Sequence, residues 1–271
     1  MATMGIEITR IEGDVMKVNA YVVQGPRGAV VVDGMLTVSD GRKVHAALDA
    51  SGSELAGVVI THPHPDHYAG LGHILGDRDV PIVATADVDA VIRRDDQTKD
   101  AIVGPMMGTE WPGTRRFPNQ IVADGGSISL GGLELRVRSL GPGESCADTI
   151  WELDDATVFA GDVAYNDTHA YLADGQWRHW LEMLERLEHE LRAAATLYVG
   201  HGPPGDRELL ARQRRYVNTF VDAVRRHPEA VAAGDHAPVL DELRRVVPSE
   251  DLLFLADLSV DAVLSTVTDP R

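Results

Sequence analysis

Three histidines and one aspartate fall within residues 61–67, and this cluster constrains the chain more than any other feature. The segment reads Thr-His-Pro-His-Pro-Asp-His and follows an apolar run at residues 55–60, which has the length of a strand buried on both faces. Neutral imidazoles and carboxylates are the ligands that zinc and related divalent metals accept. The two prolines restrict the backbone, which lowers the entropy lost when the ligands are held in place. The sequence therefore predicts a metal site at the end of a buried strand.

The spacing within this cluster predicts how the ligands divide. Alternate side chains of an extended segment point to the same side, so His62 and His64 can hold one ion. Asp66 and His67 follow the second proline and can turn towards a neighbouring ion. The alternative is a histidine-rich surface loop without metal. That alternative would be preferred for an isolated pair of histidines, but not for a cluster of this density.

Runs of β-branched residues alternate with Gly and Pro turns along most of the chain, which predicts a strand-rich protein. In the first half we expect strands at residues 6–11, 16–23, 29–32, 55–60 and 81–84 and helices at residues 39–48, 69–75 and 86–94. In the second half we expect strands at residues 121–122, 127–130, 133–139, 149–153, 157–160 and 196–199 and an amphipathic helix at residues 175–191. We predict an α/β fold in which two β-rich halves pack as a sandwich with helices outside. Residues 1–271 would form one domain, with residues 206–271 as a helical C-terminal extension.

Residues 97–119 are the least regular part of the sequence and contain several prolines and aromatic residues. A loop of this length is unusual unless it is a lid or a binding loop. We therefore interpret Trp111 and Phe117 as candidate walls of a substrate pocket. The alternative is a surface insertion that packs its own apolar residues.

The charge of the chain narrows its partners. It has 25 Lys and Arg residues against 42 Asp and Glu residues, a formal net charge of -17. Binding to nucleic acid or to an anionic membrane needs clustered cations, so we expect neither partner.

Cys146 is the only cysteine, which excludes an intramolecular disulfide framework. Residues 1–10 carry no basic segment followed by an apolar one, and we therefore expect a cytoplasmic protein.

Residues 62–67 match the pattern His-x-His-x-Asp-His. Because this pattern is the signature of the metallo-β-lactamase superfamily, the chain resembles that family and its glyoxalase II-like branch. Further marks occur in the order expected for that family: Val-Val-Asp-Gly ending at Asp33-Gly34, Phe-Ala-Gly-Asp ending at Asp162, and Tyr-Val-Gly-His-Gly around His201. The resemblance covers roughly residues 6–205. It implies an αββα sandwich with the metal site at one edge, between the two sheets.

One departure from the family pattern concerns the third ligand of the first ion. The resemblance implies a histidine in a Gly-His segment before Asp162, but this chain reads Gly143-Glu144, and no histidine occurs between His73 and His169. We interpret Glu144 as the replacement, since zinc accepts carboxylate oxygens and His₂Glu zinc sites are known. The added negative charge would weaken the ion as a Lewis acid and favour a harder metal such as manganese or iron. The alternative is that Glu144 only contacts a ligand or points to solvent.

Carried onto this sequence, the resemblance implies a dinuclear centre. The first ion would take His62, His64 and Glu144, the second would take Asp66, His67 and His201, Asp162 would bridge them, and Asp33 would support the ligands. We expect two divalent ions, with zinc favoured and manganese or iron as alternatives. Two ions close together give a bridging hydroxide at physiological pH and stabilise an oxyanion.

Two residues are candidates for a catalytic role beside the metals. Asp66 could orient the attacking water and assist proton transfer. His169, which follows Asp162 closely, could face the substrate or donate to the oxyanion. A loop histidine with neither role is the alternative for His169.

These observations predict a metal-dependent hydrolase that cleaves an ester, thioester, lactone or amide bond in a small molecule. An iron-dependent, dioxygenase-like redox enzyme on the same fold is the alternative. A binding module without catalysis is disfavoured, because the chain retains a full set of plausible ligands. We expect a small-molecule substrate, and the chain could form a homo-oligomer.

Overall fold

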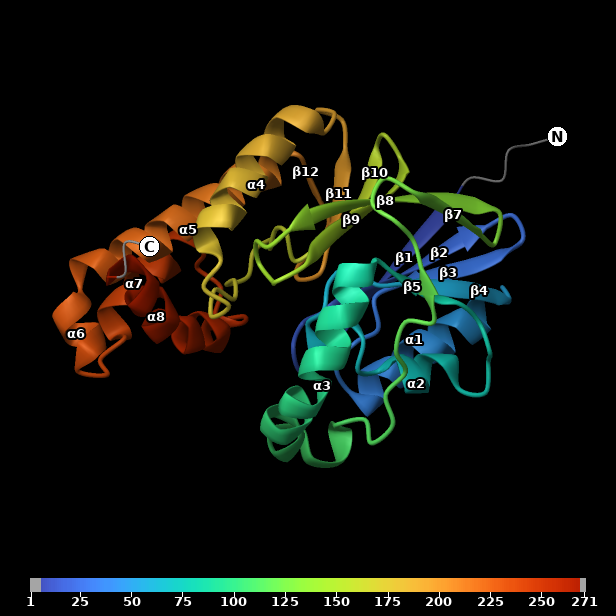
Figure 1. The fold of residues 1–271 in the computed structure, drawn as a ribbon, viewed down its shortest axis with the longest axis horizontal. Coiled ribbons are helices and arrows are strands. Elements are labelled where there is room, and N and C mark those ends of the chain that lie inside the picture. The colour runs from blue at the N-terminus through green and yellow to red at the C-terminus, as the bar shows by residue number, and fades with distance from the viewer. Residues whose placement is uncertain (1–5, 269–271) are drawn as a thin grey trace.

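The computed structural model describes residues 6–268 and contains two six-stranded β-sheets with helices outside them (Figure 1). The first sheet has the order β1 (Glu7–Glu12), β2 (Asn19–Gly25), β3 (Gly28–Val32), β4 (Leu55–Val59), β5 (Ile82–Ala84) and β6 (Gln120–Ile121). Strands β1 to β3 pair antiparallel, and β3 to β6 pair parallel.

The second sheet is built from the second half of the chain. Its order is β12 (Gly205–Asp206), β11 (Thr196–Val199), β10 (Thr157–Gly161), β9 (Asp148–Asp154), β8 (Leu133–Gly141) and β7 (Ser127–Leu130). Only β10 and β11 pair parallel; the other neighbours in this sheet are antiparallel. The carboxyl ends of β10 and β11 therefore lie together at one edge.

Three apolar clusters define the layers. Alternate residues of a strand face opposite sides. In β3, Val30 belongs to the cluster between the sheets that includes Trp151 and Phe159, whereas Val31 belongs to the cluster under the helices that cover the first sheet. These helices are α1 (Val38–Ser51), α2 (Leu71–Leu75) and α3 (Ala86–Met107). The predicted αββα sandwich is confirmed.

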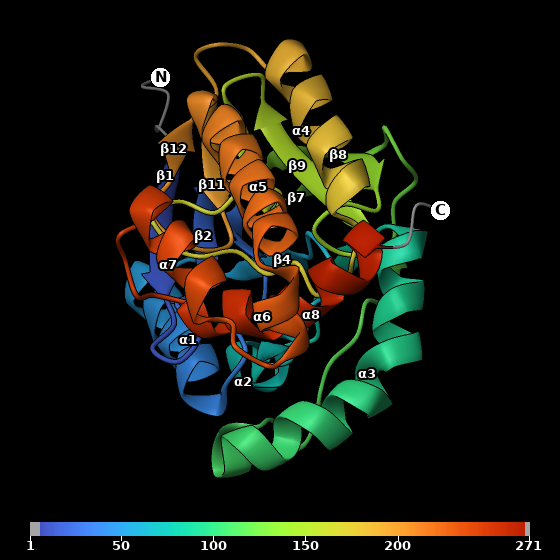
Figure 2. The same cartoon turned by 90° about the vertical axis from the view of Figure 1, so that its left-hand side faces the viewer.

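Helices from residues 177–268 cover the second sheet. Its helices are α4 (Trp177–Glu190), α5 (Glu208–Arg226), α6 (Pro228–Ala232), α7 (Ala237–Val246) and α8 (Leu253–Thr268). Helices α4 and α5 run side by side over the sheet (Figure 2). Apolar side chains from α4, α5, α7 and α8 share one cluster with the second sheet, so the predicted C-terminal helices pack onto the sandwich. Within residues 6–268, no helix has both the length and the apolar character needed to cross a bilayer.

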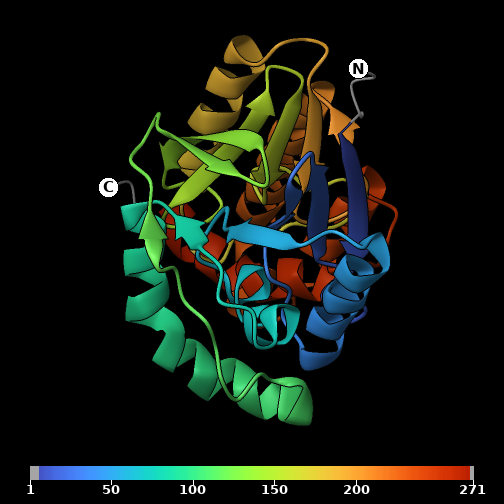
Figure 3. The ribbon, with the colours of Figure 1, turned by 90° about the vertical axis from the view of Figure 1, so that its right-hand side faces the viewer.

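The prediction of an irregular segment at residues 97–119 is wrong over its first half. Helix α3 continues to Met107, and Pro105 lies in its last turn, where the loss of one amide donor does not prevent the helix from forming. The Thr85 side chain caps the helix by accepting from the Val88 amide. Figure 3 shows α3 along one side of the molecule, curving beneath the first sheet. Helix α1 is likewise capped by Thr37 at its start.

Candidate metal centre

The predicted ligands come from four loops at one edge of the two sheets. Residues 60–67 follow β4 and include the short 3₁₀ helix Pro65–His67, which turns Asp66 and His67 away from the extended part of the loop. Asp162 directly follows β10, and His201 follows β11. Glu144 lies in the loop between β8 and β9. Ligands far apart in the sequence meet because the ends of strands in both sheets lie at this edge.

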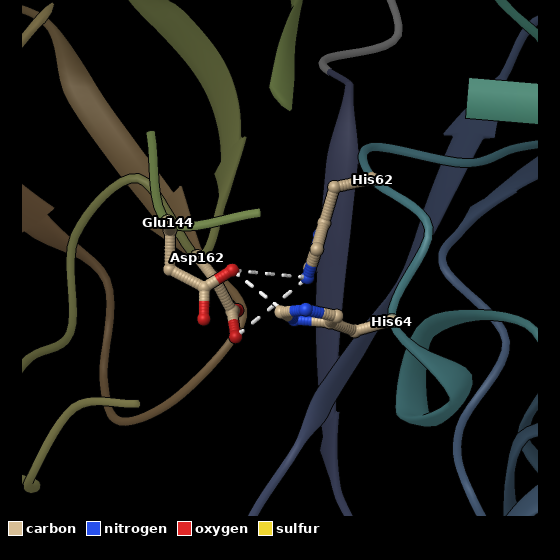
Figure 4. A group of neighbouring side chains, drawn as sticks. All are labelled: His62, His64, Glu144 and Asp162. Atoms are coloured by element: carbon tan, nitrogen blue, oxygen red, sulfur yellow. Dashed lines mark ion pairs between the residues drawn. The ribbon is translucent and has the colours of Figure 1, made fainter. Parts of the chain in front are cut away.

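The first cluster consists of His62, His64, Glu144 and Asp162, whose candidate ligand atoms all lie within 4.8 Å of one another. The Nδ1 atom of His64 is 3.1 Å from Oε2 of Glu144, and the Nε2 atom of His62 is 3.8 Å from the same oxygen. Figure 4 shows both imidazoles pointing at the two carboxylates. Glu144 therefore lies beside both histidines, where the sequence predicts it.

The second cluster consists of Asp66, His67 and His201. The Nε2 atom of His201 is 3.3 Å from Oδ2 of Asp66. Asp162 contacts this cluster as well, since its Oδ1 lies 3.4 Å from Nε2 of His67 and its Oδ2 lies 3.2 Å from Nε2 of His201. One carboxylate thus lies between the two clusters, as expected for a residue that bridges two ions.

Unpartnered buried atoms show that these residues fit a metal. Six atoms in the two clusters are buried and make no hydrogen bond, namely Nε2 of His62, Nε2 of His67, Oε2 of Glu144, Oδ1 of Asp162 and both ring nitrogens of His201. Native proteins rarely leave buried polar atoms unsatisfied, because each costs about 1–3 kcal/mol. Divalent cations accept this combination of imidazole nitrogen and carboxylate oxygen.

Asp33 supports the centre through contacts with His67 and Thr61. Its Oδ2 lies 2.9 Å from Nδ1 of His67, and it accepts hydrogen bonds from the amide and the hydroxyl of Thr61. A carboxylate on Nδ1 fixes the tautomer in which Nε2 is free to face a metal. The structure therefore places Asp33 where the sequence predicts it.

Asp174 makes an equivalent contact with His64 that sequence reasoning missed. Its Oδ2 lies 3.3 Å from Nε2 of His64, which leaves Nδ1 of that ring to face Glu144. Asp174 lies in the loop before α4, 110 residues from His64. The signal available in the sequence was only an acidic residue in a loop after Asp162.

Tyr165 is the second residue that sequence reasoning missed. Its hydroxyl lies 2.9 Å from Oε1 of Glu144 and 2.7 Å from Oδ2 of Asp162, so it contacts two carboxylates of the first cluster. The Tyr165 amide donates to Oε1 of Gln213 on α5.

Asp148 holds the other side of the Glu144 loop by accepting from the Glu144 amide at 2.7 Å.

Gly200, which precedes His201, lies too close to Asp162 and His67 for a side chain. A Cβ atom at Gly200 would lie 1.9 Å from Oδ1 of Asp162 and 2.7 Å from Cε1 of His67. Only glycine lets the backbone pass this close to the ligands. Asn19 on β2 fixes the same segment, because its side-chain amide donates to the carbonyls of Val199 and Gly202.

The predicted catalytic role of His169 does not fit the structure. Its Nδ1 lies 3.0 Å from the Tyr216 hydroxyl and its Nε2 lies 2.9 Å from the Ser249 carbonyl. Both ring nitrogens are thus used to join the loop after β10 to the C-terminal helices. His169 is absent from both clusters and from the cavity above them.

A cavity of about 400 Å³ opens over the metal centre, with His64, Asp66, Asp162, Tyr165 and His201 among its lining residues. Trp111 and Phe117 do not line it, so their prediction as pocket walls is corrected. Trp111 packs in a cluster with Leu36 and Val103, its Nε1 donates to Asp100, and Phe117 packs against Tyr68. Helix α3 itself supplies the wall that was predicted for these aromatic residues.

Burial and charge set the protonation of the ligands in the metal-free protein. Burial raises the pKa of Glu144 to about 8. Burial opposes ionisation of Asp162, but the positive charges of His201 and His67 outweigh it and hold the pKa of Asp162 well below its ordinary value. Burial disfavours protonated His201, but Asp162 outweighs it and raises the pKa of His201 to about 10. The clustered carboxylates therefore retain protons on the imidazoles that a metal would displace.

Comparison with known families decides the assignment. The model of the metallo-beta-lactamase superfamily matches residues 13–201. The chain belongs to the metallo-beta-lactamase superfamily. This confirms the resemblance seen in the motif at residues 62–67.

Solved structures of the superfamily share the fold over nearly the whole chain. A metallo-beta-lactamase family protein from Thermus thermophilus is 20% identical with a TM-score of 0.69, and the match covers 97% of this chain and 93% of that protein. A beta-lactamase domain protein from Burkholderia ambifaria is 18% identical with a TM-score of 0.68, and the match covers 98% of this chain and 87% of that protein.

One curated relative matches in part. A hydroxyacylglutathione hydrolase from Alkalilimnicola ehrlichii is 43% identical over 61 residues. This match spans 22% of the present chain and 22% of that relative, and it agrees with the resemblance to the glyoxalase II-like branch.

Proposed function

We propose that the protein is a hydrolase that uses two divalent metal ions to cleave an ester, thioester, lactone or amide bond in a small molecule. The observation that carries the proposal is the pair of ligand clusters that share Asp162 at the floor of a cavity. The partial match to a hydroxyacylglutathione hydrolase supports a thioester among the candidate bonds. When bound, two such ions would lower the pKa of a water molecule and stabilise developing negative charge.

The residues of the chain then have separate tasks. His62, His64 and Glu144 would hold one ion and Asp66, His67 and His201 the other. Asp66 also lines the cavity, so its carboxylate can accept a proton from water at the floor. Tyr165 lines the cavity beside Glu144 and Asp162, and its hydroxyl can orient both carboxylates or donate to a substrate oxygen.

Metal content tests the role of Glu144. We expect the purified protein to hold two equivalents of a divalent metal and Glu144→Ala to lose about one, because the first cluster would keep only two histidines and the shared Asp162. Elemental analysis after dialysis measures this, with Glu144→His as the control that restores a nitrogen ligand. Full metal content in Glu144→Ala would show that Glu144 is not a ligand.

Activity tests the reaction. We expect the zinc-, manganese- or iron-loaded protein to hydrolyse at least one member of a panel of esters, thioesters, lactones and β-lactams, and Asp162→Asn to lower kcat/KM at least about a hundredfold. No hydrolysis with any of the three metals would contradict the proposal. Bound iron with an absorption band and oxygen consumption would instead support the redox alternative, which the carboxylate ligand Glu144 makes chemically reasonable.

A further inference from the structure

Exposed apolar side chains gather around the cavity that leads to the metal centre. Among residues 6–268, eight large apolar side chains are exposed, and five of them line this one cavity: Val15, Ile102, Met106, Phe254 and Leu258. Ile102, Met106 and Leu258 expose 58%, 66% and 61% of their surface. Soluble proteins seldom gather exposed apolar residues without a binding role.

The apolar wall is formed from two helices far apart in the sequence. Ile102, Val103, Met106 and Met107 belong to α3, and Phe254, Leu255 and Leu258 belong to α8. The two helices face each other across the mouth (Figures 1 and 2). Among the described residues that line the cavity, Lys99, one turn before Ile102 on α3, is the only cationic side chain other than the histidines.

Most polar lining residues of the same cavity lie at the metal centre. His64, Asp66, Asp162, Tyr165 and His201 belong to the metal centre or contact it. A molecule with its reactive bond at these residues must therefore extend its remaining part along α3 and α8. A volume of about 400 Å³ lies within the range of small-ligand sites.

We propose that the substrate carries a medium-sized aliphatic or aromatic group on the bond that is cleaved, and that α3 and α8 bind this group. The inference rests on the proposed hydrolase function and names its substrate class. Burial of the apolar group would cover side chains that are otherwise exposed to water. A second copy of the chain could also cover the rim, but a flat partner surface would not fill a cavity that is continuous with the metal centre.

A series of hydroxamates tests this proposal without requiring turnover, because a hydroxamate binds a metal through its head and carries a chain of chosen length. Each buried methylene is worth about fourfold in affinity. We expect octanohydroxamate to bind the zinc-loaded protein at least about a hundredfold more tightly than acetohydroxamate, measured by calorimetry. The double variant Ile102→Gln with Leu258→Gln should reduce this ratio at least about tenfold.

Ile121→Gln provides the matched control. Ile121 is also an exposed isoleucine, with 48% of its surface accessible, but it lies on β6 and does not line the cavity. The ratio should remain that of the unsubstituted protein in this variant. A ratio near one in the unsubstituted protein, or an equal loss in the control, would overturn the proposal.

Three further measurements separate this inference from the proposed reaction and from an interface between copies of the chain. Displacement of the dye Nile red from metal-free protein should require less n-octanol than n-butanol, and the double variant should bind the dye more weakly; this supports the apolar wall even if no ester is hydrolysed. Hydrolysis of 4-nitrophenyl acetate and octanoate at equal kcat/KM would retain the hydrolase and reject the apolar preference. A dimer in sedimentation that the double variant dissociates would reject the proposal in favour of an interface.

Discussion

Tyr165 shows how much the metal centre depends on single side chains outside the ligand motifs. Its hydroxyl contacts Glu144 and Asp162, and its amide is fixed by Gln213 on α5. Groups that orient ligands in this way contribute about tenfold to a hundredfold to metal affinity. The C-terminal helices therefore act on the centre through Tyr165, although none of the ligands lies in them.

Removal of the Tyr165 hydroxyl should weaken the binding of the first ion in particular. We expect Tyr165→Phe to lower the affinity for one metal equivalent about tenfold or more, because Oε1 of Glu144 and Oδ2 of Asp162 lose the hydroxyl that orients them. Titration with a chromophoric chelator measures the two affinities. Tyr198→Phe is the control, since Tyr198 packs on Tyr21 and Phe159. Equal effects in the two variants would argue against an orienting role.

At the scale of elements, the segment after β11 decides whether the two clusters can share Asp162. Gly200 brings the backbone against Asp162 and His67, and Asn19 ties this segment to β2 in the other sheet. The sheets are thus joined by hydrogen bonds at the edge where the ligands meet. Displacement of this segment would move His201 away from both Asp66 and Asp162.

An alanine at Gly200 should cause such a displacement. We expect Gly200→Ala to lower the free energy of unfolding by about 1–3 kcal/mol and to lose at least one metal equivalent, because its Cβ would overlap Asp162. Thermal unfolding and elemental analysis measure the two effects. Gly113→Ala is the control, since a Cβ there would meet nothing within 4 Å. Metal content that is unchanged in Gly200→Ala would contradict this account of the motif.

The two clusters of candidate ligands could be predicted from the sequence because their residues occur in short motifs at the ends of strands, and strand ends meet at a sheet edge. The place of Glu144 in the first cluster could be predicted as well, since Gly143-Glu144 stands where the family pattern has Gly-His. Tyr165 and Asp174 could not, because their roles depend on contacts between distant segments. The sequence favours Trp111 as a pocket wall because it predicts a helix only over residues 86–94, whereas α3 continues to Met107 and Trp111 packs in a cluster with Leu36, Val103 and Met107.

At the scale of the whole molecule, the metal centre links stability to pH. In the metal-free protein, burial raises the pKa of Glu144 to about 8. Burial opposes protonation of His201, but Asp162 raises its pKa to about 10. Burial likewise opposes protonation of His64 and His67, but Glu144 and Asp162 respectively outweigh it and raise the pKa of each well above its ordinary value. These groups hold protons in the folded state that the unfolded chain has released, and Glu144 and His64 share one of them, because only ionised Glu144 raises the pKa of His64.

The sign of the effect follows from these directions. Stability from a group with a raised pKa is fully present below its unfolded pKa and is lost as the pH rises through its folded pKa. The unfolded values are about 4.3 for Glu and about 6.5 for His, so between pH 7 and 9 the loss from Glu144 ends near pH 8, whereas the loss from His201 continues to about pH 10. Burial and the charge of His67 lower the pKa of His62, and the pKa of Asp162 is lowered as well. The stability that these two groups contribute is complete near pH 6.5, so it does not offset the losses at higher pH.

We therefore expect the metal-free protein to lose stability from pH 7 to 9, by about 1.4 kcal/mol per pH unit for each proton retained on folding. Zinc displaces these protons, so its binding should tighten over the same range and the zinc-saturated protein should keep its Tm. Calorimetry of EDTA-treated and zinc-saturated samples measures the gap between the two Tm values, which should widen with pH. Glu144→Gln, which cannot titrate, should show a shallower loss in the metal-free state. A gap that stays constant from pH 7 to 9 would mean that the clustered imidazoles and carboxylates do not exchange protons for metal, and the ligand assignment would then fail at the level of the whole protein.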